Sequence, residues 1–71
     1  MDIVIENEVG EIIGIEVKAS ASVGANDFKG LHALSQTVGR KFRRGVILYT
    51  GSESVPFGDH LFALPIRSFW Q

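Results

Sequence analysis

Two β-branched segments joined by a short turn sequence constrain the fold of this chain more than any other feature. DIVIE, residues 2–6, alternates polar and apolar side chains, NEVG follows, and EIIGIEVKAS, residues 11–20, forms a longer apolar run. Ile and Val favour strands, whereas Asn and Gly favour tight turns. The pattern predicts an antiparallel β-hairpin at the start of the chain.

The second segment places two different sets of side chains on its two faces, because successive residues of a strand point to opposite sides. One face is wholly apolar. The other face carries Ile12, Gly14, Glu16 and Lys18. A carboxylate and an ammonium two residues apart on one face fit either a solvated ion pair or half of an active site.

Composition limits the classes of protein to which the chain can belong. Its 71 residues make one small domain, which buries only roughly 60% of the surface of the unfolded chain. It has no cysteine, which excludes a disulfide or a thiolate metal site. Since no apolar run approaches the ~20 residues of a membrane span and no signal segment opens the chain, we expect a soluble, cytoplasmic protein.

The rest of the sequence predicts one helix and two further strands. A helix is expected from an N-cap at Asn26 or Asp27 to about Val38, and Gly39 suits the position that ends it. GVILYTG, residues 45–51, is expected to form a buried strand, and GSESVPFGD a loop. HLFALPI is expected to form a final strand that Pro65 confines to an edge or an end. The predicted order is ββαββ, an α+β fold that resembles an α/β sandwich, with a central mixed sheet and one main helix.

The hairpin brings two acidic residues together. With the turn centred near Glu8 to Gly10, antiparallel register places Asp2 opposite or nearly opposite Glu16. Opposed side chains have Cβ atoms about 4.5–5.5 Å apart, and two carboxylates at that distance suit a hard divalent cation such as Mg²⁺. Lys18 would stand beside the ion, where an ammonium can orient a water molecule or balance the charge of a phosphate.

An Asp, a gap of 13 residues and then Glu-Val-Lys on the second strand of a hairpin resembles the motif of the PD-(D/E)xK nuclease superfamily. The longer series IEVKAS, NDFKGL, VILYTG, PFGD and ALPI resembles the C-terminal domain of a family of prokaryotic AAA-type ATPases of poorly defined function. This resemblance covers nearly the whole chain. It implies a restriction-endonuclease-like core in which Asp2, Glu16 and the Val17 carbonyl bind Mg²⁺ or Mn²⁺ and Lys18 serves the attacking water.

The sequence lacks two features that accompany this domain in the family. A helix and a strand normally precede the motif Asp, whereas here only Met1 does, and no G-x-x-x-x-G-K-[ST] loop of an ATPase occurs. We therefore expect a truncated nuclease-like domain, with an ATPase as its parent chain or partner. An exposed strand edge would remain where the upstream elements pack in the family, and a homodimer is one way to cover it.

Two functions remain open from the sequence. One is a metal-dependent phosphodiesterase acting on DNA, and the other is a non-catalytic interaction or oligomerisation module. The basic residues Arg40, Lys41, Arg43 and Arg44 fit phosphate contacts with nucleic acid, but cations after a helix C-terminus also stabilise its dipole. We interpret His32 and His60 as boundary residues, because neither has a clustered metal-ligating partner in the sequence.

Overall fold

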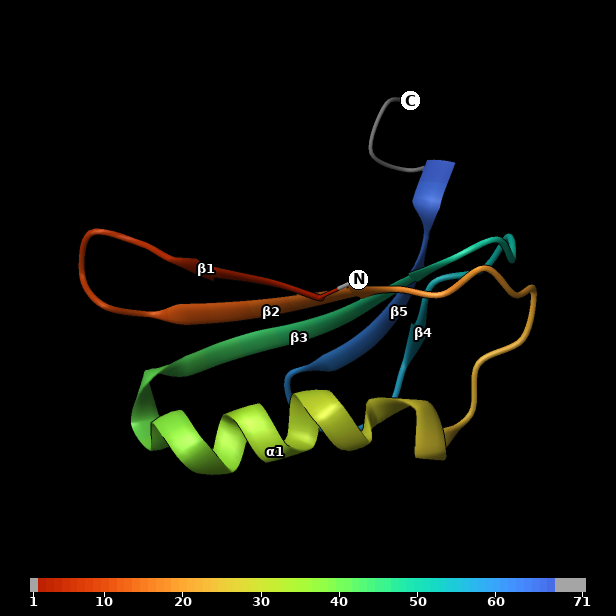
Figure 1. The fold of residues 1–71 in the computed structure, drawn as a ribbon. Coiled ribbons are helices and arrows are strands. Elements are labelled where there is room, and N and C mark those ends of the chain that lie inside the picture. The colour runs from red at the N-terminus through yellow and green to blue at the C-terminus, as the bar shows by residue number, and fades with distance from the viewer. Residues whose placement is uncertain (1, 68–71) are drawn as a thin grey trace.

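A five-stranded mixed sheet covered on one face by a helix forms the fold of residues 2–67 in the computed structural model (Figure 1). The strands are β1 (Asp2–Glu6), β2 (Ile12–Val17), β3 (Phe42–Tyr49), β4 (Val55–Pro56) and β5 (Leu61–Pro65), and the main helix is α1 (Lys29–Val38). The strand order is β1-β2-β3-β5-β4. Strands β2, β3 and β5 run parallel, and β1 and β4 pair antiparallel at the two edges. The predicted α+β class, with a mixed sheet and one main helix, is confirmed.

The predicted hairpin is present, and Asn7 organises its turn. The Asn7 side-chain oxygen accepts hydrogen bonds from the backbone N–H groups of Val9 and Glu11 at 3.0 and 2.9 Å. Gly10 has φ of 85°, a conformation in which a side chain would be strained. Strand β2 ends at Val17, three residues before the end of the predicted segment, because the chain turns at the Ser20 N–H to Lys18 carbonyl hydrogen bond.

The helix ends where it was predicted but begins differently. Gly39 follows α1 with φ of 60°, as expected for a residue that ends a helix. At the other end, a 3-10 turn, η1 (Ala25–Phe28), precedes α1, so the prediction of Asn26 or Asp27 as the N-cap is wrong. Gly24 is the N-cap of η1, and Phe28 is the N-cap of α1. Asp27 contributes from inside the turn by accepting a hydrogen bond from the Gly24 N–H at 2.8 Å.

Two strand predictions also require correction. Strand β3 begins at Phe42 instead of residue 45, because Phe42 and Arg44 pair with Ile12 and Ile13 of β2. The segment predicted as a loop contains the short strand β4, which pairs with β5, so the observed order is ββαβββ. Pro65 lies at the end of β5, as predicted.

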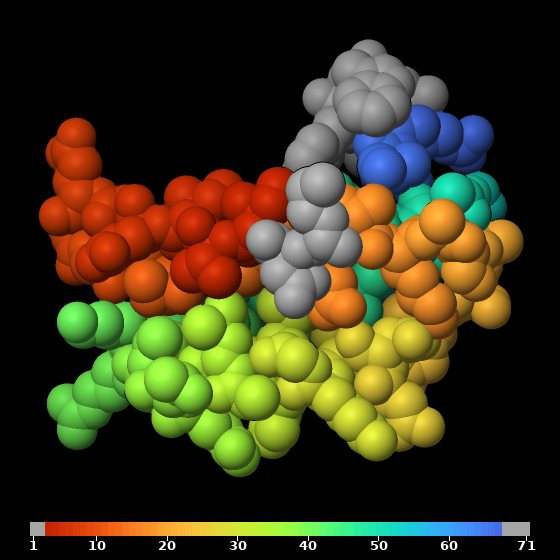
Figure 2. Space-filling model, in the orientation of Figure 1, coloured from red at the N-terminus to blue at the C-terminus, as the bar shows by residue number. Residues whose placement is uncertain are grey.

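Helix α1 packs closely on the middle of the sheet, and the core lies between them. The buried cluster comprises Phe28, Leu31, Ile47, Tyr49 and Ala63. A Cβ atom at position 14 would lie 2.7 Å from Leu31 Cδ2 and 2.8 Å from Leu34 Cδ2, so the helix approaches β2 only because Gly14 has no side chain. Figure 2 shows the hairpin resting directly on α1. No helix among residues 2–67 is long and apolar enough to cross a membrane.

Candidate functional site on the hairpin

The two acidic residues singled out in the sequence are direct partners across the hairpin. The Cα partner of Asp2 on β1 is Glu16 on β2, which confirms the predicted register. Direct cross-strand partners have Cβ atoms about 4.5–5.5 Å apart, so the register places positions 2 and 16 side by side on the sheet.

That face is the one covered by α1. Ile12 and Gly14, which share a face of β2 with Glu16, are buried against the helix. Glu16 is half-buried and lines a cleft of about 200 Å³ between β1, β2 and α1, together with Gly14 and Gly30. Among the described residues of that lining, it is the only one with a charged side chain. A Cβ atom on Gly30 would lie 3.8 Å from the Glu16 carboxylate, so this glycine leaves space beside the oxygen, whereas Leu31 and Leu34 occupy the space above Gly14.

Lys18 extends along the same face and bonds to the start of the helical segment. Its ammonium lies 2.8 Å from Asp27 Oδ1, and its backbone N–H donates to the Leu48 carbonyl at 2.8 Å. The hydrogen bond from Lys18, assisted by the one from the Gly24 N–H, lowers the pKa of the Asp27 carboxyl below its ordinary value of 3.8. The ion pair therefore fixes the end of β2 against η1.

The residues of the hairpin supply some, but not all, of the ligands that a divalent cation needs. Among the described residues no group of three or more His, Asp or Glu side chains is placed to hold a metal ion. The opposed Asp2 and Glu16 positions supply two carboxylates, and there is space beside Glu16. Mg²⁺ commonly binds through one or two carboxylates while it keeps several water ligands. The residues present are compatible with that kind of site and not with a cation held by protein ligands alone.

The basic residues do not form one patch. Arg40 and Lys41 lie in a 3-10 turn, η2 (Gly39–Lys41), whereas Arg43 and Arg44 belong to β3. The Arg43 Nε lies 3.9 Å from Glu11 Oε2. The Arg44 guanidinium lies 5.3 Å from the centre of the Phe62 ring, on the sheet face away from α1. Only the first two follow the helix end, so the helix-dipole interpretation does not extend to the arginines of the strand.

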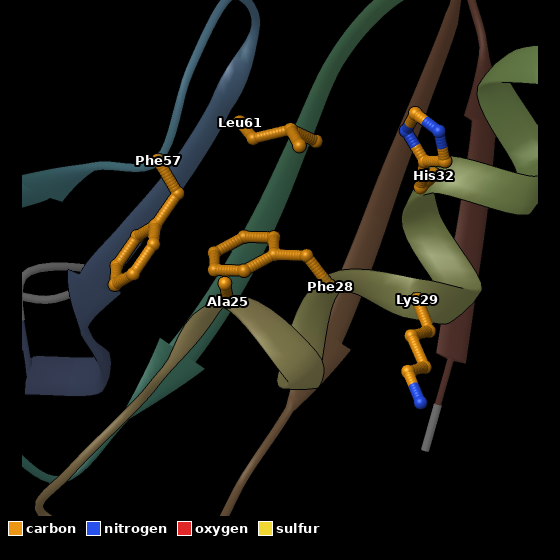
Figure 3. Close-up of a pocket in the computed structure, with 6 residues that line it drawn as sticks. All are labelled: Ala25, Phe28, Lys29, His32, Phe57 and Leu61. Atoms are coloured by element: carbon orange, nitrogen blue, oxygen red, sulfur yellow. The ribbon is translucent and has the colours of Figure 1, made fainter.

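Sequence reasoning missed two groupings that depend on the fold. His32 and His60, 28 positions apart in the chain, line a common cleft of about 500 Å³, which also includes Arg40 and Asp59. Nearby, the rings of Phe28 and Phe57 pack with centroids 4.8 Å apart and line an apolar hollow of about 210 Å³. Figure 3 shows Lys29 extending away from these rings. No sequence spacing indicates either cluster, because α1 and the segment before β5 meet only in three dimensions.

Comparison with known proteins identifies a family for this chain. Residues 1–69 match the family model described as a domain of unknown function, DUF4143, a domain often found in AAA-ATPase-associated proteins. No curated protein and no solved structure matches the chain. The match covers nearly the whole chain and assigns no activity.

Proposed function

The chain belongs to the DUF4143 family, and within that family we propose that it carries a metal-dependent phosphodiesterase site at the hairpin. The observation that supports the proposal best is the pairing of Asp2 with Glu16, with Lys18 on the same face. Carboxylates that face each other repel unless a cation lies between them, and such a pair beside an ammonium suits chemistry on a phosphate.

In this proposal Asp2, Glu16 and the Val17 carbonyl hold Mg²⁺ or Mn²⁺. The bound ion would polarise a phosphate oxygen and acidify a coordinated water molecule. The chain itself orients the carboxylates: the pairing of β1 with β2 fixes Asp2 relative to Glu16, and the absence of a side chain at Gly30 leaves space beside the Glu16 carboxylate.

Lys18 acts in the proposal as a charge stabiliser instead of a base. Its Nζ lies 2.8 Å from Asp27 Oδ1, so the side chain is already held in an ion pair beside Glu16. A positioned ammonium stabilises negative charge that develops on a phosphoryl group, and a preorganised group does so without reorganisation during the reaction. Asp27 is then a positioning residue for Lys18.

DNA is the proposed substrate, with the basic residues as contacts to its phosphates. Arg40 and Lys41 at the helix end are better placed for this role than Arg43 and Arg44, which have partners within the chain. Phosphate contacts add affinity without sequence preference and weaken as salt rises. A cytoplasmic location and an ATPase as parent chain or partner complete the proposal.

A titration with Mg²⁺ and Mn²⁺ followed by amide NMR tests the site. The wild type is expected to show saturable changes centred on residues 2, 16 and 18. Glu16→Ala should lower the affinity at least roughly tenfold, since it removes one of two carboxylate ligands. Glu6→Ala is the matched control, because Glu6 is an exposed carboxylate on the same face of the same hairpin but pairs with Ile12. The absence of a saturable site at millimolar metal would reject the proposal.

The alternative is a non-catalytic interaction module, and the Lys18–Asp27 ion pair favours it. This pair has a purely structural use, because it ties the end of β2 to η1 across the loop of residues 19–24. In that case Glu16→Ala and Glu6→Ala should behave alike, with neither metal binding nor phosphodiester cleavage in the wild type. Cleavage of a DNA oligonucleotide by the wild type but not by Glu16→Ala would decide for the enzyme.

A further inference from the structure

Two adjoining hollows lie on the flank of α1 that faces β5, away from the proposed metal site. The cleft of about 500 Å³ contains His32, Arg40 and His60, and the apolar hollow of about 210 Å³ contains Phe57. Both spaces have His32 and Leu61 in their walls, and we call them together the α1–β5 cleft. Side by side they have the size of a ligand pocket, which is commonly about 300–1,000 Å³.

The apolar end of the α1–β5 cleft presents an aromatic ring. Phe57 is half-buried, and its ring centroid lies 4.8 Å from that of Phe28. Phe28 is only 3% exposed, so Phe57 supplies the ring surface that a ligand can reach. In Figure 3 the two rings lie together, and the His32 imidazole stands at the other end of the hollow. An aromatic ring that is fixed by packing beside an open hollow offers a surface on which a planar group can stack.

The polar end of the cleft carries hydrogen-bond donors. Arg40 and His60 are exposed there, and His32 lies between this end and the apolar one. His60 has φ of 70°, and non-glycine residues held in this region are concentrated at functional sites. A guanidinium presents a fork of N–H donors that matches the oxygens of a phosphate, and an imidazole N–H can add a further hydrogen bond. The polar end therefore suits an anionic group.

The charges of the chain favour a ligand held by stacking over a ligand held by charge alone. The formal net charge is -1, so the chain as a whole does not attract a polyanion. Among the described residues of the polar end, Arg40 carries a positive charge and Asp59 a negative one. The ligand that fits has a planar apolar part and a single anionic group beside it. A nucleotide, with its base and its phosphate, has this composition.

On the basis of the proposed function, with DNA as its substrate, we propose that the α1–β5 cleft binds one unpaired nucleotide of a DNA strand. The base stacks on Phe57, and the phosphate contacts Arg40. Bases of a duplex are stacked on each other, so only an unpaired base reaches the ring. The proposed metal site lies on the other flank of α1, beside Glu16. The nucleotide held in the cleft is therefore not the one that is cleaved, and the cleft contributes to binding and not to the reaction.

Fluorescence anisotropy of a labelled oligothymidylate of about eight nucleotides tests the proposal, with EDTA present so that binding does not depend on a metal ion. The wild type should bind this strand at least roughly fivefold more tightly than an abasic strand of the same length, because the abasic strand has the same phosphates and no base to stack. Phe57→Leu keeps an apolar side chain but removes the ring. This variant should bind the two strands with nearly equal affinity.

Arg40→Gln tests the phosphate contact. It should weaken binding and reduce the slope of log K against log salt concentration by about 0.7, the value for one phosphate contact on a single strand. Arg43→Gln is the matched control, because it removes the same charge at the hairpin end, where Arg43 lies 3.9 Å from Glu11. This control should leave the slope unchanged. Far-ultraviolet circular dichroism must show that the three variants are folded.

Three results would overturn the proposal. One is a wild type that binds the abasic strand as tightly as the oligothymidylate, or binds neither at millimolar protein. Another is a slope reduced by Arg43→Gln as much as by Arg40→Gln, which would indicate diffuse attraction by charge. The third is displacement of the oligothymidylate by polyglutamate of equal charge, which would indicate an acidic protein segment as the ligand.

The metal titration separates this cleft from the proposed metal site. Saturable binding of Mg²⁺ or Mn²⁺ without a preference for the oligothymidylate would reject the nucleotide cleft alone. A preference for the oligothymidylate in EDTA, lost in Phe57→Leu, without any metal site would reject the phosphodiesterase alone.

Discussion

The contact between Gly14 and α1 makes a sharp prediction about stability. In Gly14→Ala the new methyl group would lie 2.7 Å from Leu31 Cδ2 and 2.8 Å from Leu34 Cδ2, closer than van der Waals contact allows. Overpacking of this kind costs about 1–3 kcal/mol, and the lower entropy of the unfolded Ala variant returns about 0.4–1 kcal/mol. The net expectation is a loss of about 1–2 kcal/mol. For a domain of this size, that loss corresponds to a fall in Tm of roughly 5–15 °C.

Gly30→Ala is the matched control for this change. Position 30 lies in α1, where Ala is favoured over Gly by about 0.8–1 kcal/mol, and its new methyl group would lie at an ordinary distance of 3.8 Å from the Glu16 carboxylate. This variant should be as stable as the wild type or more stable. The two substitutions are chemically identical and differ only in what the methyl group meets.

Urea unfolding followed by circular dichroism measures both variants. A third variant combines Gly14→Ala with Leu34→Ala. It should lose less free energy of unfolding than the sum of the two single changes, because Leu34→Ala removes one of the two side chains that the new methyl group would clash with. Gly14→Ala that is as stable as Gly30→Ala would refute the close packing of α1 on β2. It would also remove the basis for the position of Glu16 beside the helix.

Two further predictions concern Asp27 and His60. The pKa of Asp27 is lowered in the folded protein, so its contribution to stability is present above pH about 4 and is lost as pH falls through the folded pKa. Urea midpoints measured from pH 6 downward should therefore fall more steeply for the wild type than for Asp27→Asn, and parallel curves would contradict the Lys18 pair. His60 has φ of 70°, a region that Gly adopts without strain. His60→Gly should keep or raise the thermal midpoint, whereas His60→Val should lower it by several degrees through a cost of about 1–2 kcal/mol.

The hairpin and its register could be predicted because the information is local. Asn7 and Gly10 specify the turn, and once the turn is placed the sum of paired residue numbers is constant along both strands, which puts Asp2 opposite Glu16. The helix end could be predicted for the same reason, since Gly39 adopts the conformation that ends a helix.

The missed features depend on partners that are distant in the chain. Strand β4 has only two residues and exists because Val55 and Pro56 pair with β5. Phe42 extends β3 because it meets Ile12 of β2, although the basic residues around it resemble the end of a helix. The start of the helical segment, in contrast, does carry a local signal in the sequence. The spacing from Gly24 to Asp27 matches the acidic position of a capping box, and this signal could have corrected the predicted N-cap.

The proposed metal site depends on strand β1, which carries Asp2. Strand β1 lies at the edge of the sheet and pairs with β2, so the position of Asp2 relies on a single ladder of hydrogen bonds. A cation held by Asp2 and Glu16 would add a second connection between the two strands. By linkage, the strand pairing and the bound cation would then stabilise each other by the same factor.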